Sequence, residues 1–376
     1  SNARRKAVFY TLKDGLSQCA KRQAVTRAPR FFANIGRHGR RNMNIILTFA
    51  EFFKSITMGI IKFVKEWTLP CAMVFGAAMY LLFTEIPALV PFGHMAGPWF
   101  IEILPVLIFM TLYVTFCKIR LHDLRLHTWH VWMQVIRIAM AVALVFAIMN
   151  TTDNTLRLAL EGAFACVICP TASAAAVVTE KLGGSIASMT VYTLIDNAVT
   201  ALLVPLLFPM VEKHADVTFM SSFATILQRT AVVLVLPFVC AMATRRWLPR
   251  MAKVIKDCRN LGFYFWAVNL SIVMGMTLHN IFTAGISWLS MTALIVVPAV
   301  VTLLLFGTGK AVGRHYGDSV DGGQALGQKN TGVGIWLVMV YLNPVIAIAP
   351  CAYVVWQNTL NSWQLWCMEK YGRLKW

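Results

Sequence analysis

Two ionisable residues lie in strongly apolar parts of the chain. Lys329 falls in the glycine-rich stretch GQALGQKNTGVGIW (323–336), and Asp196 falls beside Asn197 in YTLIDNAVTALLVP (192–205). A charge at the centre of a bilayer costs at least ~2.5–3.5 kcal/mol, so each needs a compensating partner or a role. We predict that Asp196 and Lys329 pair, either as a structural salt bridge or as a pair that opens when a proton, cation or substrate arrives.

Four further charged residues fall inside apolar segments: Glu102, Arg137, Glu161 and Arg229. Glu102 and Glu161 lie near the predicted outer ends of their segments, so we expect solvated or snorkelling carboxylates there. Arg137 lies in the middle of its segment, where a structural and a functional pair are both open. Arg229 receives no role.

Proline and glycine interrupt two of the apolar segments. The first interruption is CPTASAAA, which contains Pro170, and the second is GQKNTGVG, which contains Gly327 and Gly332. Broken helices free backbone groups that can face an ion or a substrate. We predict that these two unwound stretches, 171–176 and 327–332, cross each other.

The composition is that of a membrane protein. Hydrophobic residues make up 58% of the 376 residues, against about 45–50% in soluble proteins. The formal net charge of +18 would suit nucleic acid, but eleven of the 34 Lys and Arg lie between Arg4 and Arg41 and most others lie in alternate loops. That distribution indicates a cytoplasmic bias and no nucleic-acid partner. The nine cysteines show no metal spacing, so Cys166 and Cys169 are expected to be packing residues.

Ten apolar segments reach the length of about 17–25 residues that crosses the hydrocarbon core. The predicted spans are 67–84, 99–117, 129–149, 157–179, 186–211, 220–243, 259–280, 287–308, 323–342 and 344–366. Residues 1–3 look like an expression remnant. The chain divides into a basic cytoplasmic segment, an amphipathic interfacial helix, a ten-span transporter domain and a basic cytoplasmic tail (1–43, 44–66, 67–366 and 367–376).

An even number of spans places both termini on one side, and the basic loops make that side the cytoplasm of a plasma (cell inner) membrane. Ten spans divide into two halves of five that enter the membrane from opposite sides. Both interruptions fall in the fourth span of their half, which is the pattern of a midplane binding site. We predict an all-helical membrane protein of two inverted five-helix repeats, with two broken helices crossing at the midplane.

Three stretches resemble the bile acid:sodium symporter family. The first, GQKNTGVG, resembles the family motif G-x-Q-N-S-G-L-A. The second, CPTASAAAVVTEKLGGSIA (169–187), resembles the helix break C-P-G-G-T-A-S-N of the family. The third, NPVIAIAPCAYVVWQNTLNSW (343–363), resembles the last span of the family, which contains V-W-[HQ]-N. The resemblance covers about residues 67–366. It implies a core domain plus a panel domain, and alternating-access transport of organic anions coupled to sodium.

The chain departs from this family at the sodium ligands. Matching the glycines puts Lys329 where the family has a sodium-binding Gln and Ala325 where it has a sodium-binding Glu. The family's Ser-Asn pair falls on Ala175 and Ala176. Sodium wants several hard oxygen ligands, so we expect no usual sodium site, an ammonium in its place and transport that does not require sodium. The coupling ion, proton or sodium, stays open.

The crossing is where the resemblance places a binding site for a small organic anion. The positive ends of the half-helices would act together with the lysine on an anionic group. The candidate residues are Thr171, Ser173, Thr193, Asp196, Asn197, Gln328, Lys329, Asn330 and Thr331. No metal and no cofactor is expected, and the expected partners are the lipid bilayer and a small organic anion or cation.

A second resemblance supports an alternative function. LIDNAV (194–199) with Lys329 is similar to the acidic pair and lysine of cation/proton antiporters, which share this fold. The alternative is therefore a cation/proton antiporter that uses Asp196 and Lys329. A bare channel is also open, whereas an enzyme is not expected because no zinc motif, nucleophile elbow or His/Asp cluster is present. Substrate identity and oligomeric state are not indicated.

Overall fold

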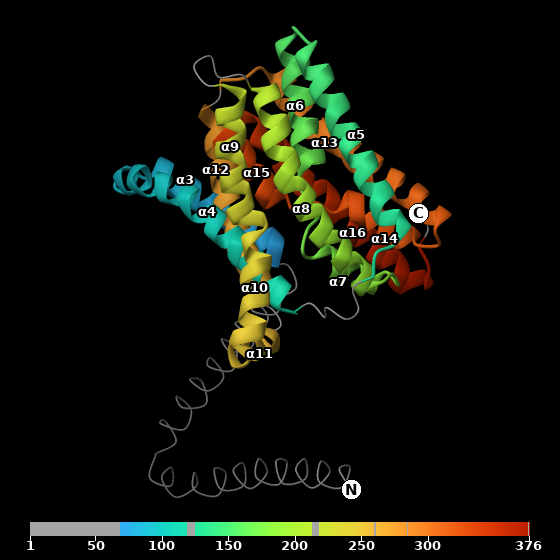
Figure 1. Ribbon diagram of the computed structural model, residues 1–376. Coiled ribbons are helices and arrows are strands. Elements are labelled where there is room, and N and C mark those ends of the chain that lie inside the picture. Colours follow the sequence, from blue (N-terminus) through green and yellow to red (C-terminus); the bar gives the residue numbers. More distant parts are fainter. Residues whose placement is uncertain (1–67, 119–124, 213–217, 259–260, 284, 375) are drawn as a thin grey trace, which may run out of the picture. The chain divides into compact units, whose positions relative to one another are not determined.

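A computed structural model of the chain describes residues 68–118, 125–212, 218–258, 261–283, 285–374 and 376 (Figure 1). The predicted basic segment and interfacial helix (1–66) lie outside the described residues. Helices form the regular structure of the described part, together with one isolated two-residue bridge. The all-helical prediction is therefore confirmed for these residues.

The helices follow one another in the order of the predicted spans. Their bounds are α3 Thr68–Glu85, α4 Val90–Lys118, α5 Thr128–Met149, α6 Asn154–Ile168, α7 Ala175–Lys181, α8 Ile186–Val211, α9 Phe219–Leu234, α10 Leu236–Trp247, α11 Pro249–Asp257, α12 Leu261–Thr283, α13 Trp288–His315, α14 Ser319–Gly327, α15 Thr331–Tyr341, the 3-10 helix η2 Pro344–Ala347 and α16 Ile348–Tyr371.

Each predicted span corresponds to one helix or to a pair of successive helices. The pairs are α6 with α7, α9 with α10, α14 with α15, and η2 with α16. Five helical stretches of the described part are long and apolar enough to cross a membrane, and a bent α4 would add a sixth. The count of ten spans and their inverted repeat remain predictions. Helix α16 continues to Tyr371, so the start of the predicted tail is helical.

Local sequence signals explain where the helices of the site begin and end. Helix α6 begins after Asp153, whose side chain accepts a hydrogen bond from the Leu156 N–H (2.7 Å) and so caps the helix. It ends at Ile168, two residues before Pro170, because proline excludes the helical conformation from its predecessor. Helix α8 begins after Ser185, which caps it in the same way.

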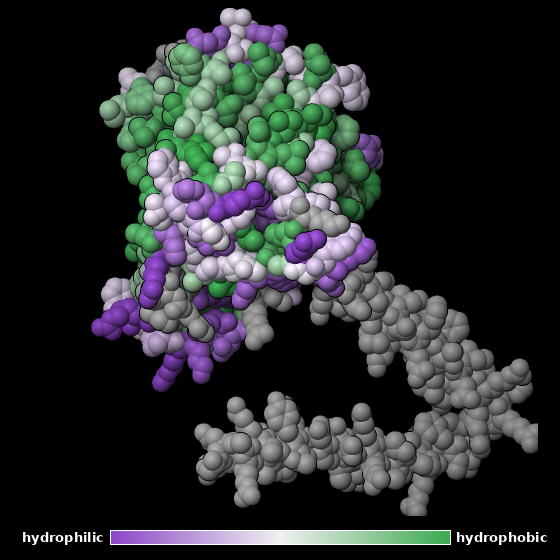
Figure 2. Space-filling view, turned by 90° about the vertical axis from the view of Figure 1, so that its right-hand side faces the viewer, coloured by the Kyte–Doolittle hydropathy of each residue, from purple (hydrophilic) through white to green (hydrophobic). Residues whose placement is uncertain are grey.

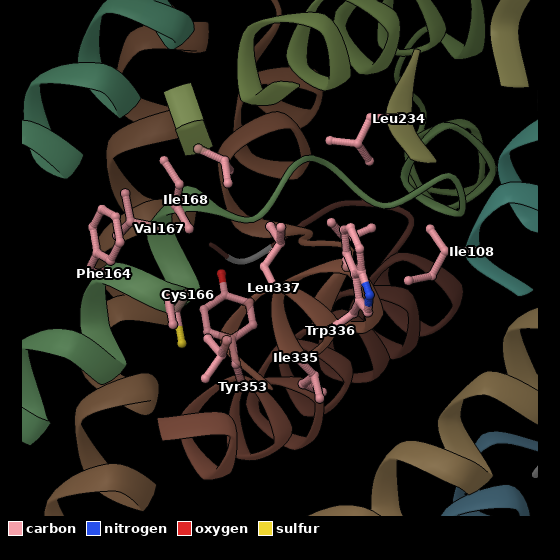
Figure 3. Packing of buried hydrophobic residues seen from close by; sticks show 14 of the residues in the cluster. Ile108, Phe164, Cys166, Val167, Ile168, Leu234, Ile335, Trp336, Leu337 and Tyr353 are labelled. Atoms are coloured by element: carbon pink, nitrogen blue, oxygen red, sulfur yellow. The ribbon is translucent and has the colours of Figure 1, made fainter. Parts of the chain in front are cut away.

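The helices pack in two groups (Figure 1). In the first group α13 packs against α6, α14 and α16, and α5 packs against α6 and α8. In the second group α4 packs against α10, α11 and α12. A buried apolar cluster joins the groups, since Ile108 of α4 and Leu234 of α9 belong to the same cluster as Phe164, Trp336 and Tyr353 (Figure 3).

The surface is unusually apolar for a folded chain. Figure 2 shows apolar residues over the upper half of one face, with hydrophilic residues gathered below them. Tryptophans are among the most exposed side chains, and Trp288 is 88% exposed. Large exposed apolar areas mark a surface that meets a partner or lipid. The distribution therefore supports burial of this face in a bilayer.

Candidate functional site

Two helix breaks meet in the interior of the first group. Helix α6 ends at Ile168 and α7 begins at Ala175, while α14 ends at Gly327 and α15 begins at Thr331. Between them, Thr171 and Lys329 form an antiparallel bridge. Two backbone hydrogen bonds flank the bridge: Ala172 N–H to the Gln328 carbonyl (2.9 Å) and Asn330 N–H to the Pro170 carbonyl (2.7 Å). The predicted crossing is therefore present.

The two break sequences contribute differently to the unwinding. Pro170 lies inside the first break, as predicted. Gly327 is the last residue of α14 and Gly332 already belongs to α15, so the second break covers only 328–330. The bridge geometry makes Thr171 and Lys329 a pair without mutual hydrogen bonds, whose side chains lie on the same face of the crossing. Their neighbours along the strands therefore point to the other face.

Asp196 of α8 is fully buried behind the crossing and receives hydrogen bonds on both oxygens. Gln134 Nε2 donates to Oδ1 (2.7 Å), and the Arg137 guanidinium pairs with the same oxygen (Nε to Oδ1, 2.9 Å). Thr171 donates to Oδ2 through its N–H (2.6 Å) and its hydroxyl (2.8 Å). The prediction that Asp196 pairs directly with Lys329 is wrong, because Arg137 takes that place.

The Arg137 guanidinium contacts four residues on three helices, α5, α6 and α8. Besides Asp196, it donates to Gln134 Oε1 (Nη2, 3.0 Å), to the hydroxyl of Thr200 (3.0 Å) and to the carbonyl of Ile168 (3.2 Å). Ile168 is the last residue of α6, where the helix dipole favours a cation. The structure thus identifies Asp196 as the partner of the buried Arg137.

Lys329 is 1% exposed, and its Nζ has no hydrogen-bond partner among the described residues. Its backbone is held from α16: the Lys329 N–H donates to Gln357 Oε1 (2.8 Å), and Gln357 Nε2 donates to the Lys329 carbonyl (3.2 Å). Asp196, Arg137, Cys169 and Cys166 are the groups whose charges or dipoles act on the ammonium. A desolvated cation without an acceptor is costly, so the position favours arrival of an anion or a lone pair.

A family comparison is consistent with this arrangement of breaks. The model of the SBF-like CPA transporter family matches residues 99–359, which is more than half of the chain. The chain belongs to this family. The resemblance to the bile acid:sodium symporters is thereby confirmed, and the protein is a multi-pass membrane transporter by family and by its apolar helices. No curated protein matches the chain.

The two breaks of this SBF-like transporter are pinned in the same manner. Asp196 of α8 accepts the N–H of Thr171, and Gln357 of α16 accepts the N–H of Lys329. In each half of the chain, the helix that follows the broken span, α8 or α16, thus supplies a side-chain oxygen that accepts the N–H of the residue at the crossing. Such a repeated pattern is what an inverted repeat would produce.

The hydrogen bonds of the other predicted site residues do not define a shared ligand position. Thr193 donates its hydroxyl within α8 (to Met189 O, 2.9 Å), and Asn197 Nδ2 donates to the Thr193 carbonyl (2.7 Å). Asn197 Oδ1 and Gln328 Oε1 are buried without partners in the described part. Ser173 lies in the first break, Asn330 ends the second break, and Thr331 begins α15.

Sequence reasoning missed four polar residues near the crossing: Gln134, Asn269, Tyr353 and Gln357. Tyr353 donates its hydroxyl to the carbonyl of Gly327 (2.6 Å), at the end of α14. Gln357 and Tyr353 both lie in the stretch that carries the V-W-[HQ]-N likeness, so that motif was the available signal. Gln134 lies one helical turn before Arg137, which is the spacing of side chains on one helix face.

Two further predictions about the transporter can be compared with the structure. Glu161 is only 4% exposed and pairs with Arg157 (2.9 Å), so the expected solvated carboxylate is wrong there. Its pairing partner lies one turn earlier in α6, which explains how a buried carboxylate is tolerated. Glu102 is exposed, as expected. Cys166 and Cys169 are buried and unbridged, in keeping with packing, and Cys166 lies beside Tyr353 in Figure 3.

Proposed function

We propose that this SBF-like protein is a secondary active transporter that moves a small organic anion by alternating access. The observation that carries the proposal is the Lys329 ammonium, which is buried at the crossing without a hydrogen-bond partner in the described part. Nearby, the charge of Asp196 is offset by Arg137. Two cations and one anion therefore leave an excess of positive charge, which attracts an anion in a medium of low dielectric constant.

Lys329 also takes the place of sodium in this proposal. The positions that correspond to the symporters' other ligands, Ala325 and Ala175, are fully buried and apolar. A methyl group offers sodium no oxygen, and an adjacent ammonium repels it. We therefore propose transport that needs no sodium, in a plasma membrane with both termini in the cytoplasm.

The geometry gives less support to the cation/proton antiporter. That function needs a carboxylate whose oxygens can accept an incoming cation, and Asp196 is the candidate. Its two oxygens already receive two hydrogen-bond or ion-pair contacts each, one of them from a permanent cation. Releasing Asp196 would strand Arg137 in the interior, which costs about 3–5 kcal/mol for a buried pair.

The test is uptake into proteoliposomes of a panel of labelled organic anions, from short carboxylates to a conjugated bile acid. Sodium gradients and proton gradients are imposed separately. We expect saturable anion uptake that is unchanged when sodium is replaced by choline. Lys329→Gln should reduce uptake by at least about tenfold, which is the effect of losing about 1.4 kcal/mol of binding. Lys181→Gln, at the exposed end of α7, is the control and should transport normally.

Three results would contradict the proposal. Saturable sodium dependence at constant proton gradient and potential would show that a sodium site forms. Proton-driven cation efflux without anion uptake would establish the antiporter. Conduction that does not saturate would establish a channel.

A further inference from the structure

One buried acid remains outside the proposed site. The described part buries three carboxylates: Glu161, Asp196 and Asp321. The first two lie beside arginines at 2.9 Å. Asp321 is 3% exposed and forms no ion pair with a described residue. Its one hydrogen bond from another residue comes from the Ser185 N–H to Oδ1 (3.0 Å).

Asp321 lies where one half-helix meets the turn that follows the other. It belongs to α14, which packs against α5, α7, α8 and α13. Its Oδ2 and the Cγ2 of Thr179 both lie within 2.6 Å of the point that a Cβ on Gly184 would occupy. Gly184 sits in the turn between α7 and α8, so the absence of a side chain there is what lets the carboxylate approach. Asp321 and Thr179 are therefore neighbours across the α7–α14 contact.

Thr179 supplies a complementary group. Its side chain is fully buried, and its hydroxyl oxygen has no hydrogen-bond partner in the described part. An ionised Asp321 presents only acceptors, and Oδ2 has no donor from a neighbouring residue. A protonated Asp321 keeps the Ser185 N–H on Oδ1 and gains an O–H donor on Oδ2. The Thr179 hydroxyl can accept that O–H, and it can also donate to an ionised Oδ2, so it suits a carboxyl group that changes between the two states.

The charges around Asp321 act in both directions. Asp318, which precedes α14, disfavours a second negative charge nearby and so favours the protonated form of Asp321. A positively charged His127 at the start of α5 favours the carboxylate form. The positive end of α14 also favours the carboxylate. Burial without a permanent cation favours the neutral form. Lys310 of α13 also packs against α14, beside Gly323, and its ammonium donates to the Trp376 carbonyl. Glu180 and Lys181 at the end of α7 are exposed.

We propose that Asp321 binds the coupling proton of the transporter. The proton arrives from water, forms an O–H bond on Oδ2 and neutralises the carboxylate; it leaves by the reverse step. This inference rests on the proposed function, because it names the ion that would replace sodium. Helix α14 has nine residues and ends at the crossing, so a proton that changes the contact between α7 and α14 acts on both breaks at once.

Proton binding is measured without knowing the transported anion. The full chain is reconstituted in nanodiscs, and infrared difference spectra are recorded as pH is stepped through the neutral range. We expect the carbonyl band of a protonated carboxyl group to appear as pH falls and to be missing in Asp321→Asn. Asp257→Asn, an exposed acid at the end of α11, is the matched control and should keep the band.

Thr179→Val tests the partner while preserving its shape. The Thr179 hydroxyl stabilises the carboxylate by donating to it more than it stabilises the acid by accepting from it, because hydrogen bonds to ionised groups are the stronger ones. Its loss should therefore move the midpoint of the band to higher pH. Thr190→Val, whose exposed hydroxyl bonds only within α8, should leave the midpoint unchanged. Melting temperatures give a second measurement. The fold favours the protonated form, so wild-type stability should fall as pH rises through the midpoint, and Asp321→Asn should lose this dependence.

The outcomes separate the two proposals. A band that persists in Asp321→Asn, or a midpoint that ignores Thr179→Val, overturns the proton site whatever the protein transports. If the band behaves as expected but no organic anion is taken up, the proton site stands and the proposed cargo is wrong. If anion uptake is driven by a proton gradient equally well in wild type and Asp321→Asn, transport stands and the coupling role of Asp321 is overturned.

Discussion

Lys329 carries its charge into a buried region where no acceptor of the described part forms a hydrogen bond with its Nζ. Replacing it with a methionine of similar length removes the uncompensated ammonium and keeps the volume. We therefore expect Lys329→Met to raise the stability of the folded protein by about 1–3 kcal/mol while it abolishes transport. The measurement is thermal unfolding in nanodiscs beside the uptake assay. Lys181→Met, an exposed control, should change neither.

A lower melting temperature for Lys329→Met would show that the ammonium has a stabilising partner. Stability and transport would then depend on the same contact. The expected opposite signs are the mark of a residue that is kept for function at a cost to the fold.

Arg137 and Asp196 should behave in the opposite way, because each charge compensates the other in the interior. Removing one partner strands the other, so Arg137→Met and Asp196→Asn are each expected to destabilise by about 3–5 kcal/mol. The double variant should recover part of this loss. A double-mutant cycle in unfolding free energy measures the coupling. Additive losses would contradict a direct pair.

The pair of Arg157 and Glu161 offers a matched comparison. It has the same separation of 2.9 Å, but the Arg157 side chain is 44% exposed. Solvent screens an exposed pair, so its coupling should be only about 0–1 kcal/mol. Equal coupling in the two cycles would mean that burial does not set the strength of the Arg137–Asp196 pair.

The chemistry of these residues could be predicted from the sequence, but their partners could not. A charged residue in an apolar segment can be recognised from its residue type alone. Asp196 and Lys329 were identified in this way, and both lie at the crossing. Which cation reaches Asp196 depends on the relative rotation and depth of α5 and α8, which apolar periodicity does not specify. Arg137 is the cation that pairs with Asp196, because it lies on the same face of α5 as Gln134, which donates to the same carboxylate.

At the scale of the elements, the breaks were readable because proline and glycine act locally. Pro170 ends α6 wherever that helix is placed. The division between α9 and α10 at Val235 was not predicted, although Pro237 follows it closely. An apolar segment with one proline reads as a single span, because proline is also compatible with a bent helix. The crossing itself is a long-range contact that no local pattern contains, and it was predicted from the matching positions of the breaks.

Close packing of α15 against α6 gives a prediction at this scale. A Cβ on Gly334 would overlap the Sγ of Cys169. Gly334→Ala is therefore expected to destabilise the protein by about 1–3 kcal/mol, the usual cost of overpacking. Adding Cys169→Ala removes the sulfur and should restore most of the loss. Melting temperatures of the single and double variants measure both effects.

Gly97 is the matched control for this experiment. It lies inside α4, and a Cβ there would meet nothing within 4 Å. Gly97→Ala should therefore leave stability unchanged or raise it slightly, by up to about 1 kcal/mol. A loss at Gly97 as large as that at Gly334 would point to a backbone effect of alanine and not to the contact with Cys169.

At the scale of the whole molecule, the predicted orientation can be tested through a natural cysteine. Cys258 is exposed and free, after α11 and next to the basic loop that is predicted to be cytoplasmic. We expect a membrane-impermeant maleimide to label it in inside-out vesicles and not in intact cells. Cys258→Ser identifies the signal, and Asp153→Cys, on the predicted opposite side, should show the reverse pattern. Labelling of Cys258 from outside would invert the orientation.

The sequence predicted each apolar segment but not how the helices sort into two groups. Segment length and composition are properties of a single helix, whereas group membership depends on which surfaces fit. The close approaches between α13 and α14 illustrate this, because a Cβ on Gly309 would overlap the backbone of Gly322. Glycine in an apolar run also has other uses, so its presence alone does not identify the partner helix.

A cation that is part of the chain cannot supply energy to a secondary transporter in the way that a dissolved cation can. Sodium has a concentration on each side of a membrane, so it can release energy by passing from one side to the other. The ammonium of Lys329 is tethered at the crossing and returns with the protein after every cycle, so around a closed cycle it performs no net work. A carrier that exchanges an ion for a lysine keeps the electrostatic attraction and gives up that energy source. Uphill transport must then draw on another gradient, or the carrier equilibrates its cargo.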